Sequence, residues 1–186
     1  DTQHGVVDYQ MAITMLQAIS TTDVIPLVRV PWNDPGLLMK TLDAGAYGVF
    51  CPMINTADDA AALVRACKYP PQGIRSFGPI RAKYYAGGGT HGGGDYHLCA
   101  NEETLVIPQI ETREAIENLD EILQVEGIAA ELDPALLRLQ RPVERELLVY
   151  RVVGLDTQVG RLQQRLRAHV GASLAHDRGV VVERAD

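Results

Sequence analysis

The sequence contains few cysteines, and they form no pattern. The three, Cys51, Cys67 and Cys99, are odd in number and widely spaced, with no Cys-x-x-Cys pair among them. Secreted disulfide scaffolds are rich in cysteine, and structural zinc sites need closely spaced ligands. The sequence therefore indicates neither, and we expect a protein of the reducing cytoplasm.

Long apolar runs and an excess of positive charge are also missing. The longest largely apolar stretches, residues 47–54 and 60–64, are far shorter than the roughly 20 residues of a membrane-spanning helix. The formal net charge is −7, whereas nucleic-acid binding depends on clustered Lys and Arg. No membrane or nucleic-acid partner is expected.

The chain begins at Asp1 without a basic or apolar leader, so we expect no signal peptide and a missing upstream segment.

The composition is that of a globular domain. Of the 186 residues, 46% are hydrophobic and 22% are charged, which argues against disorder and low complexity. Short β-branched runs alternate with segments whose apolar residues recur at helical spacing. Strands are predicted at residues 24–30, 47–52 and 105–110, and helices at residues 35–45, 57–68 and 113–124. Because parallel strands need crossover helices, this order predicts an α/β fold with a parallel sheet covered by helices.

Two regions depart from this alternation. Residues 69–103 form a long connection with two glycine triplets, where we expect a flexible lid or rim. Beyond Ile128 the composition changes, because residues 129–186 contain nine Arg and no Lys, against five Arg and three Lys before them. One amphipathic helix is predicted near residues 159–170. We therefore expect two parts, residues 1–128 and a divergent Arg-rich segment at residues 129–186.

Polar side chains stand where the predicted strands end. Gln109 and Glu111 are two residues apart, so on a strand both side chains leave on the same face. A carboxylate is a hard oxygen ligand suited to Mg²⁺ or Mn²⁺, and a Gln amide beside it can hold a water in the coordination shell. The alternative is a strand end with ordinary solvated polar groups, and spacing alone favours that alternative.

Arg29 and His4 each allow two interpretations. Arg29 interrupts an apolar strand, where it either binds an oxyanion or forms a structural ion pair with Asp34 or Asp43. His4 lies close in sequence to Asp1, a carboxylate that can fix the imidazole tautomer. Because imidazole titrates near neutral pH, His4 is either a general base or an ordinary surface residue.

Several segments together resemble the HpcH/HpaI aldolase family, which includes 4-hydroxy-2-oxoheptanedioate aldolase and the 2-keto-3-deoxy sugar-acid aldolases. The resemblance covers residues 1 to about 128. Agreement in this order at several strand ends is far more specific than one short motif. It rests on Asp1-Thr-Gln-His4-Gly, Val28-Arg29-Val-Pro-Trp-Asn-Asp-Pro35, Leu42-Asp43-Ala-Gly-Ala-Tyr-Gly48, Pro52-Met53, Tyr69-Pro-Pro-Gln-Gly-Ile-Arg75-Ser-Phe-Gly78 and Gln109-Ile-Glu111-Thr-Arg-Glu-Ala115.

The resemblance implies a (β/α)₈ barrel, of the TIM-barrel type, that cleaves a 4-hydroxy-2-oxo acid reversibly to pyruvate and an aldehyde. The implied cofactor is Mg²⁺ or Mn²⁺, with Co²⁺ and Zn²⁺ as further options, and a homo-oligomer is implied as well. By resemblance Glu111 is a metal ligand, and Gln109 lies beside the metal and its water and binds the substrate. Arg29 binds the substrate and stabilises the charge that builds on the pyruvate oxygen, while His4, oriented by Asp43, moves the proton.

The match stops short of the family's second metal carboxylate, the Asp of a Gly-Pro-x-Asp-Leu motif. Counting on from Ile128, that Asp falls at Leu137, and Asp133 lies four residues too early. A barrel of this type needs about 250 residues. We therefore expect a barrel incomplete at both ends, with weak metal binding and little activity for this chain alone. A divergent, rearranged or out-of-frame tail is our hypothesis for the change in composition.

Two other functions remain as alternatives. One is a related lyase that acts on a CoA thioester, which is disfavoured because Trp32-Asn33-Asp34 and Ile74-Arg75-Ser76 resemble the sugar-acid branch. The other is an inactive fragment or an interaction module whose Arg-rich tail binds a partner. A folded, monodisperse protein that binds no metal would favour this second alternative.

Overall fold

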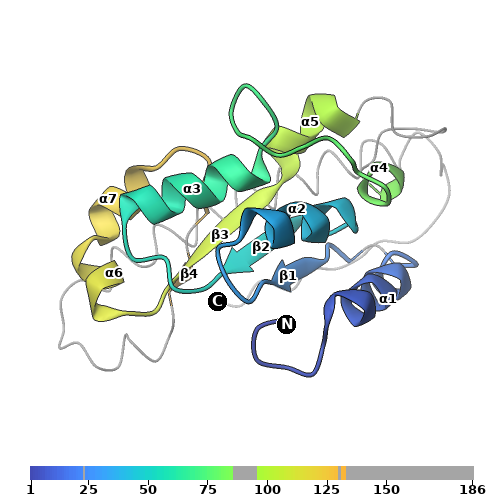
Figure 1. Ribbon diagram of the computed structural model, residues 1–186, viewed down its shortest axis with the longest axis horizontal. Coiled ribbons are helices and arrows are strands. Elements are labelled where there is room, and N and C mark those ends of the chain that lie inside the picture. Colours follow the sequence, from blue (N-terminus) through green and yellow to red (C-terminus); the bar gives the residue numbers. More distant parts are fainter. Residues whose placement is uncertain (23, 86–95, 130, 133–186) are drawn as a thin grey trace, which may run out of the picture.

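The computed structural model describes residues 1–22, 24–85, 96–129 and 131–132, so the tail and its predicted helix lie outside the described residues. The described strands form one parallel sheet in the order β1-β2-β3-β4. Figure 1 shows α2 and α3 in front of these strands and α1 beside α2. The α/β class is therefore confirmed. In chain order the elements are α1 (Tyr9–Ile19), β1 (Leu27–Arg29), α2 (Pro35–Asp43), β2 (Gly48–Cys51), α3 (Ala57–Cys67), α4 (Ala82–Tyr85), α5 (Tyr96–Glu103), β3 (Leu105–Ile110), α6 (Arg113–Glu117), α7 (Leu119–Gln124) and β4 (Glu131–Leu132).

The helix starts follow from local sequence. Asp34 is the N-cap of α2 and accepts a hydrogen bond from the Leu37 N–H at 2.8 Å, and Pro35 occupies the first helical turn. Thr56 and Asp59 form a capping box at the start of α3, in which each side chain accepts from the other's backbone N–H. The predicted helices at these two places are confirmed to within a few residues.

Two predicted elements differ from the structure. The first strand begins only at Leu27, because the preceding Pro26 has no N–H to contribute to the sheet. The helix predicted over residues 113–124 is divided into α6 and α7 at Asn118, whose φ and ψ are −96° and 10°. The Asn118 side chain donates to the Asn55 carbonyl at 2.9 Å, so a tertiary contact holds the break.

The sheet has two different faces. One is covered by helices, and its core includes Val30, Val49, Val106 and Ile110 from the sheet segments, packed against buried residues of α2, α3, α6 and α7. The opposite face carries a separate cluster, made of Leu27, Phe50, Leu105, Ile107 and Ala129. Side chains of one strand therefore alternate between a helix-packed face and a face that the described helices leave free.

The connection predicted as a lid is partly regular structure. It includes α4 and α5, and Tyr69, Ala82, Tyr96 and Ala100 from this region form a small buried cluster. Residues 86–95, which hold the glycine triplets, lie outside the described residues. Neither α4 nor α5 was predicted, and α1 was also missed. Among the described helices none is both long and apolar enough to cross a membrane.

Candidate active site

Arg29 and Gln109 lie on the same face of the sheet. Arg29 pairs in register with Phe50, and Phe50 pairs with Ile107, so these three side chains leave on one face. Gln109 follows Ile107 by two residues and shares that face. It is the face opposite the helix-packed core, and both residues stand near the carboxyl ends of their strands. The strand register thus places Arg29 and Gln109 on one side of the sheet.

Asp1 is the ion-pair partner of Arg29. The Arg29 Nε donates to Asp1 Oδ1 at 3.0 Å, and Nη2 donates to Oδ2, which gives a two-point contact. The Thr2 N–H also donates to the Arg29 carbonyl at 2.9 Å, so the first residues run beside the end of β1. Neither Asp34 nor Asp43, the two partners that the sequence suggested, forms this pair. The Arg29 side chain is 31% exposed.

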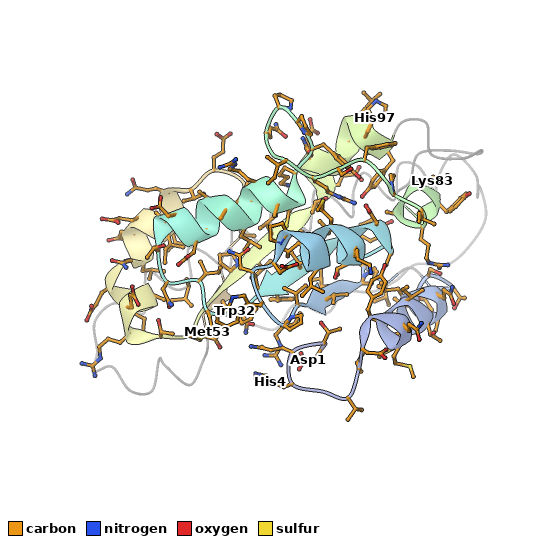
Figure 2. The ribbon with its side chains drawn as sticks, viewed as in Figure 1. Asp1, His4, Trp32, Met53, Lys83 and His97 are labelled. Atoms are coloured by element: carbon orange, nitrogen blue, oxygen red, sulfur yellow. The ribbon has the colours of Figure 1, made fainter. Side chains whose placement is uncertain are left out.

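His4 comes soon after Asp1 in the chain, and its side chain is exposed. Figure 2 shows Asp1 and His4 in the same part of the molecule as Trp32 and Met53, which follow β1 and β2. The imidazole therefore belongs to the carboxyl-end edge of the sheet. The Asp1 carboxylate accepts hydrogen bonds from Arg29 and from the Gln3 N–H, and none joins it to His4 in the described part of the chain.

Asp43 is not brought to His4. Helix α2 runs back from the carboxyl ends of the strands, and Asp43 is its last residue, at the amino ends. There its Oδ1 accepts a hydrogen bond from Arg75 Nη2 at 2.7 Å. Within one chain the described partner of Asp43 is therefore Arg75 and not His4, and the orientation of His4 by Asp43 stays a prediction. The physical reason is the antiparallel course of a crossover helix, which separates its two ends by its own length.

Glu111 follows β3 directly and is held by the loop after β2. Its Oε1 accepts a hydrogen bond from the Met53 N–H at 2.8 Å. The next residue, Thr112, donates through its hydroxyl to Asn55 Oδ1 at 2.5 Å, which ties the two loops together. One carboxylate oxygen of Glu111 is thus fixed by a backbone donor, and no other hydrogen bond joins the Glu111 side chain to the described residues.

Gln109 presents a buried amide oxygen that has no partner. Its Oε1 is inaccessible to solvent and makes no hydrogen bond within the described part of the chain. A buried polar atom without a partner is costly, and such atoms in native structures mark a bound ligand or water. Together with the free oxygen of Glu111, this amide provides two hard oxygen donors that fit part of the coordination shell of a divalent cation.

A complete protein ligand set is not found in the described ranges. No group of three or more His, Cys, Asp or Glu side chains that could hold a metal occurs there. The positions weighed for the second carboxylate, Asp133 and Leu137, lie outside the described residues. Cys51, at the end of β2, is no substitute, because its side chain lies in the buried core on the helix-packed face, away from Arg29 and Gln109.

Sequence reasoning missed two contacts of this site. The Asp1–Arg29 pair joins residues 28 positions apart, and the Met53–Glu111 hydrogen bond joins residues 58 apart. Pro52-Met53 was part of the family resemblance, but no residue-level signal indicated that a backbone N–H would be the functional group. The sequence related Asp1 only to His4, its near neighbour in the chain.

This parallel α/β sheet carries the Arg29 guanidinium and the oxygen donors of Gln109 and Glu111 at the carboxyl ends of its strands. Many α/β enzymes hold their active sites at this edge. The model of the HpcH/HpaI aldolase/citrate lyase family matches residues 1–132. The chain belongs to this family, and the resemblance stated from its sequence is confirmed.

Two curated relatives and one solved structure illustrate the similarity. The hydroxypyruvate/pyruvate aldolase of Rhizorhabdus wittichii is 45% identical over 128 residues, which cover 69% of this chain and 49% of the relative. The 4-hydroxy-2-oxo-heptane-1,7-dioate aldolase of Escherichia coli is 41% identical over 128 residues, covering 69% of this chain and 48% of the relative. A crystal structure of a family member from Burkholderia cenocepacia has a TM-score of 0.64 and 26% identity, covering 92% of this chain and 65% of that one. The chain thus spans about half the length of the curated relatives it matches.

Proposed function

We propose that this chain is part of a divalent-metal-dependent pyruvate aldolase, which cleaves a 4-hydroxy-2-oxo acid reversibly to pyruvate and an aldehyde. The relatives named as aldolases support the reaction type. The observation that carries the proposal is the shared face of Arg29 and Gln109, with Glu111 directly after β3. This face, opposite the helices, would be the inner face of a (β/α)₈ barrel to which the described strands contribute.

The oxygen donors would hold the cofactor. Glu111 and the amide of Gln109 are the described groups that fit Mg²⁺ or Mn²⁺. When bound, the cation supplies Lewis-acid polarisation of the 2-oxo group. The weak binding expected for one protein carboxylate follows from the small number of anionic ligands.

Arg29 and His4 would act on the substrate directly. A guanidinium is always protonated, so Arg29 can stabilise the negative charge that grows on the C2 oxygen as the C3–C4 bond breaks. The exposed His4 imidazole would take the proton from the 4-hydroxyl oxygen and so release the aldehyde, and the protonated imidazole would return a proton to C3 of the enolate to give pyruvate. No role in this step is proposed for Asp43 within one chain, because its described partner is Arg75.

Pyruvate release from a 4-hydroxy-2-oxo acid tests the proposal. The protein is first treated with a chelator and then assayed with and without Mn²⁺ or Mg²⁺. We expect slow release that needs the cation and is lost in His4→Ala. His97→Ala is the matched control, because His97 is also exposed and Figure 2 shows it well away from His4.

Three results would count against the proposal. Pyruvate release that is independent of both cations would contradict the proposed dependence on a metal. Equal loss of activity in His4→Ala and His97→Ala would contradict the proposed role of His4. Cleavage of a 3-hydroxyacyl-CoA thioester without cleavage of the free oxo acid would favour the CoA-thioester lyase instead.

A further inference from the structure

Met53 has an unusual backbone conformation next to the candidate site. Its φ is +58°, in the left-handed region, which costs an unbranched residue roughly 1–2 kcal/mol. Among the described residues, Met53 is the one non-glycine residue with a positive φ. The flanking Pro52 and Ile54 are both fully buried, so the packing on either side holds the conformation in place. A strained residue that its surroundings hold in place calls for a functional explanation.

The conformation directs a backbone donor at Glu111. The Met53 N–H lies 2.8 Å from Glu111 Oε1, across 58 positions of sequence. The Met53 side chain is 38% exposed and takes no part in this bond. Figure 2 shows it near Trp32, in the part of the molecule that holds Asp1 and His4. The backbone, and not the thioether, is therefore the part of Met53 that contacts the site.

We propose that Met53 is a positioning residue, whose left-handed backbone fixes the Glu111 carboxylate through its N–H. With Oε1 held, the carboxylate plane cannot rotate freely, and Oε2 is presented to a ligand in one orientation. The second loop contact, from Thr112 to Asn55, keeps the two loops in register and so maintains the hydrogen bond. The consequence for metal binding rests on the proposed function, while the hydrogen bond itself does not.

The direct test observes the Met53 amide. The chain has four methionines, so selective ¹⁵N-methionine labelling of the full chain gives a spectrum with few backbone signals. Met53→Leu assigns the Met53 signal. Glu111→Ala is expected to speed hydrogen exchange of the Met53 amide by about tenfold, as loss of a hydrogen bond to a charged group does. Met11 is an internal control, because its N–H donates to Asp8 Oδ1 at the same 2.8 Å and should not change. An unchanged Met53 exchange rate in Glu111→Ala would overturn the proposal.

Mn²⁺ titration tests the positioning effect. Met53→Gly adopts a positive φ without strain and keeps the N–H, and Met53→Leu keeps an unbranched side chain, so both should bind Mn²⁺ within about threefold of the parent chain. Met53→Val, branched at Cβ, should weaken binding by about tenfold or more, because a β-branched residue disfavours this conformation. Circular dichroism checks that each variant folds. Equal weakening by Gly and Val would overturn the proposal, since it would point to the side chain.

The two proposals can fail separately. If Glu111→Gln leaves Mn²⁺ affinity unchanged, the metal role of Glu111 fails. The exchange rate of the Met53 amide then still decides whether Met53 holds this carboxylate.

Discussion

The Asp43 carboxylate lies 2.7 Å from the Arg75 guanidinium, at the amino ends of the strands and away from the candidate site. The Arg75 side chain is fully buried, and its guanidinium carbon lies 4.5 Å from the centre of the Tyr69 ring. Two further nitrogens of Arg75, Nε and Nη1, have no hydrogen-bond partner in the described part of the chain. Asp43 is therefore the anion that neutralises a buried cation.

Removal of Asp43 is expected to destabilise the fold. Asp43→Ala leaves the Arg75 charge buried and unpaired, which costs about 3–5 kcal/mol of unfolding free energy. Urea denaturation measures the change. Asp58→Ala is the control, because Asp58 is exposed in the first turn of α3, and its effect should be about 0.5 kcal/mol or less. A stable Asp43→Ala chain with an altered pH profile of pyruvate release would instead restore the link between Asp43 and His4.

Arg29 is expected to affect turnover more than metal binding. Arg29→Ala should lower pyruvate release by about 10²-fold or more, since one preorganised donor to a developing oxyanion has an effect of this size. Its Mn²⁺ affinity should stay within about threefold, because the proposed metal ligand is Glu111 and not the guanidinium. The coupled pyruvate assay and calorimetric titration give the two values. Arg113→Ala, at the exposed start of α6, is the control and should change neither. Parallel loss of both quantities in Arg29→Ala would contradict the assigned role.

Lys68 makes stability depend on pH. Burial lowers the pKa of its ammonium from 10.5 to about 8, while its Nζ donates to the carbonyls of Asn101 and Thr104. Between pH 8 and 10.5 the unfolded chain therefore binds more protons at Lys68 than the folded chain. The Lys68 contribution to stability rises with pH across this window, by at most about 3 kcal/mol, and is constant below it.

The pH effect is measured as a difference between two chains. Lys68→Met keeps a similar length and cannot titrate, so its unfolding free energy should lack the rise between pH 8 and 10. The comparison is needed because the buried thiols of Cys51 and Cys67, whose pKa values burial raises to about 12, lower stability above pH 9 in both chains. Parallel pH curves for the two chains would show that Lys68 is not responsible.

The three thiols should differ in reactivity. Cys51 and Cys67 are buried and held neutral, whereas Cys99 is only partly buried. Because the thiolate is the reactive form, a disulfide reagent at pH 8 should modify one thiol per folded chain quickly and the other two only after unfolding in urea. Cys99→Ser should remove the fast phase. Fast reaction of two or more thiols in the folded chain would contradict the packing of β2 against α3.

Much of the fold could be predicted because its signals are local. The β-branched run of β3 was predicted with its observed bounds, and the caps Asp34 and Thr56 start their helices where short-range chemistry puts them. The break at Asn118 could not be predicted, because it depends on a contact with the Asn55 carbonyl, 63 positions away. The family resemblance likewise depended on residues that can be compared one by one along the chain.

The sequence by itself determined the order of strands and helices, the family, and the presence of Arg29, Gln109 and Glu111 at strand ends. Only the tertiary structure decided that Arg29 pairs with Asp1, that Asp43 pairs with Arg75, and that Met53 donates to Glu111. The reason is physical. Local conformation depends on neighbours in the chain, whereas the partner of a charge depends on strand register and on which end of a helix it occupies.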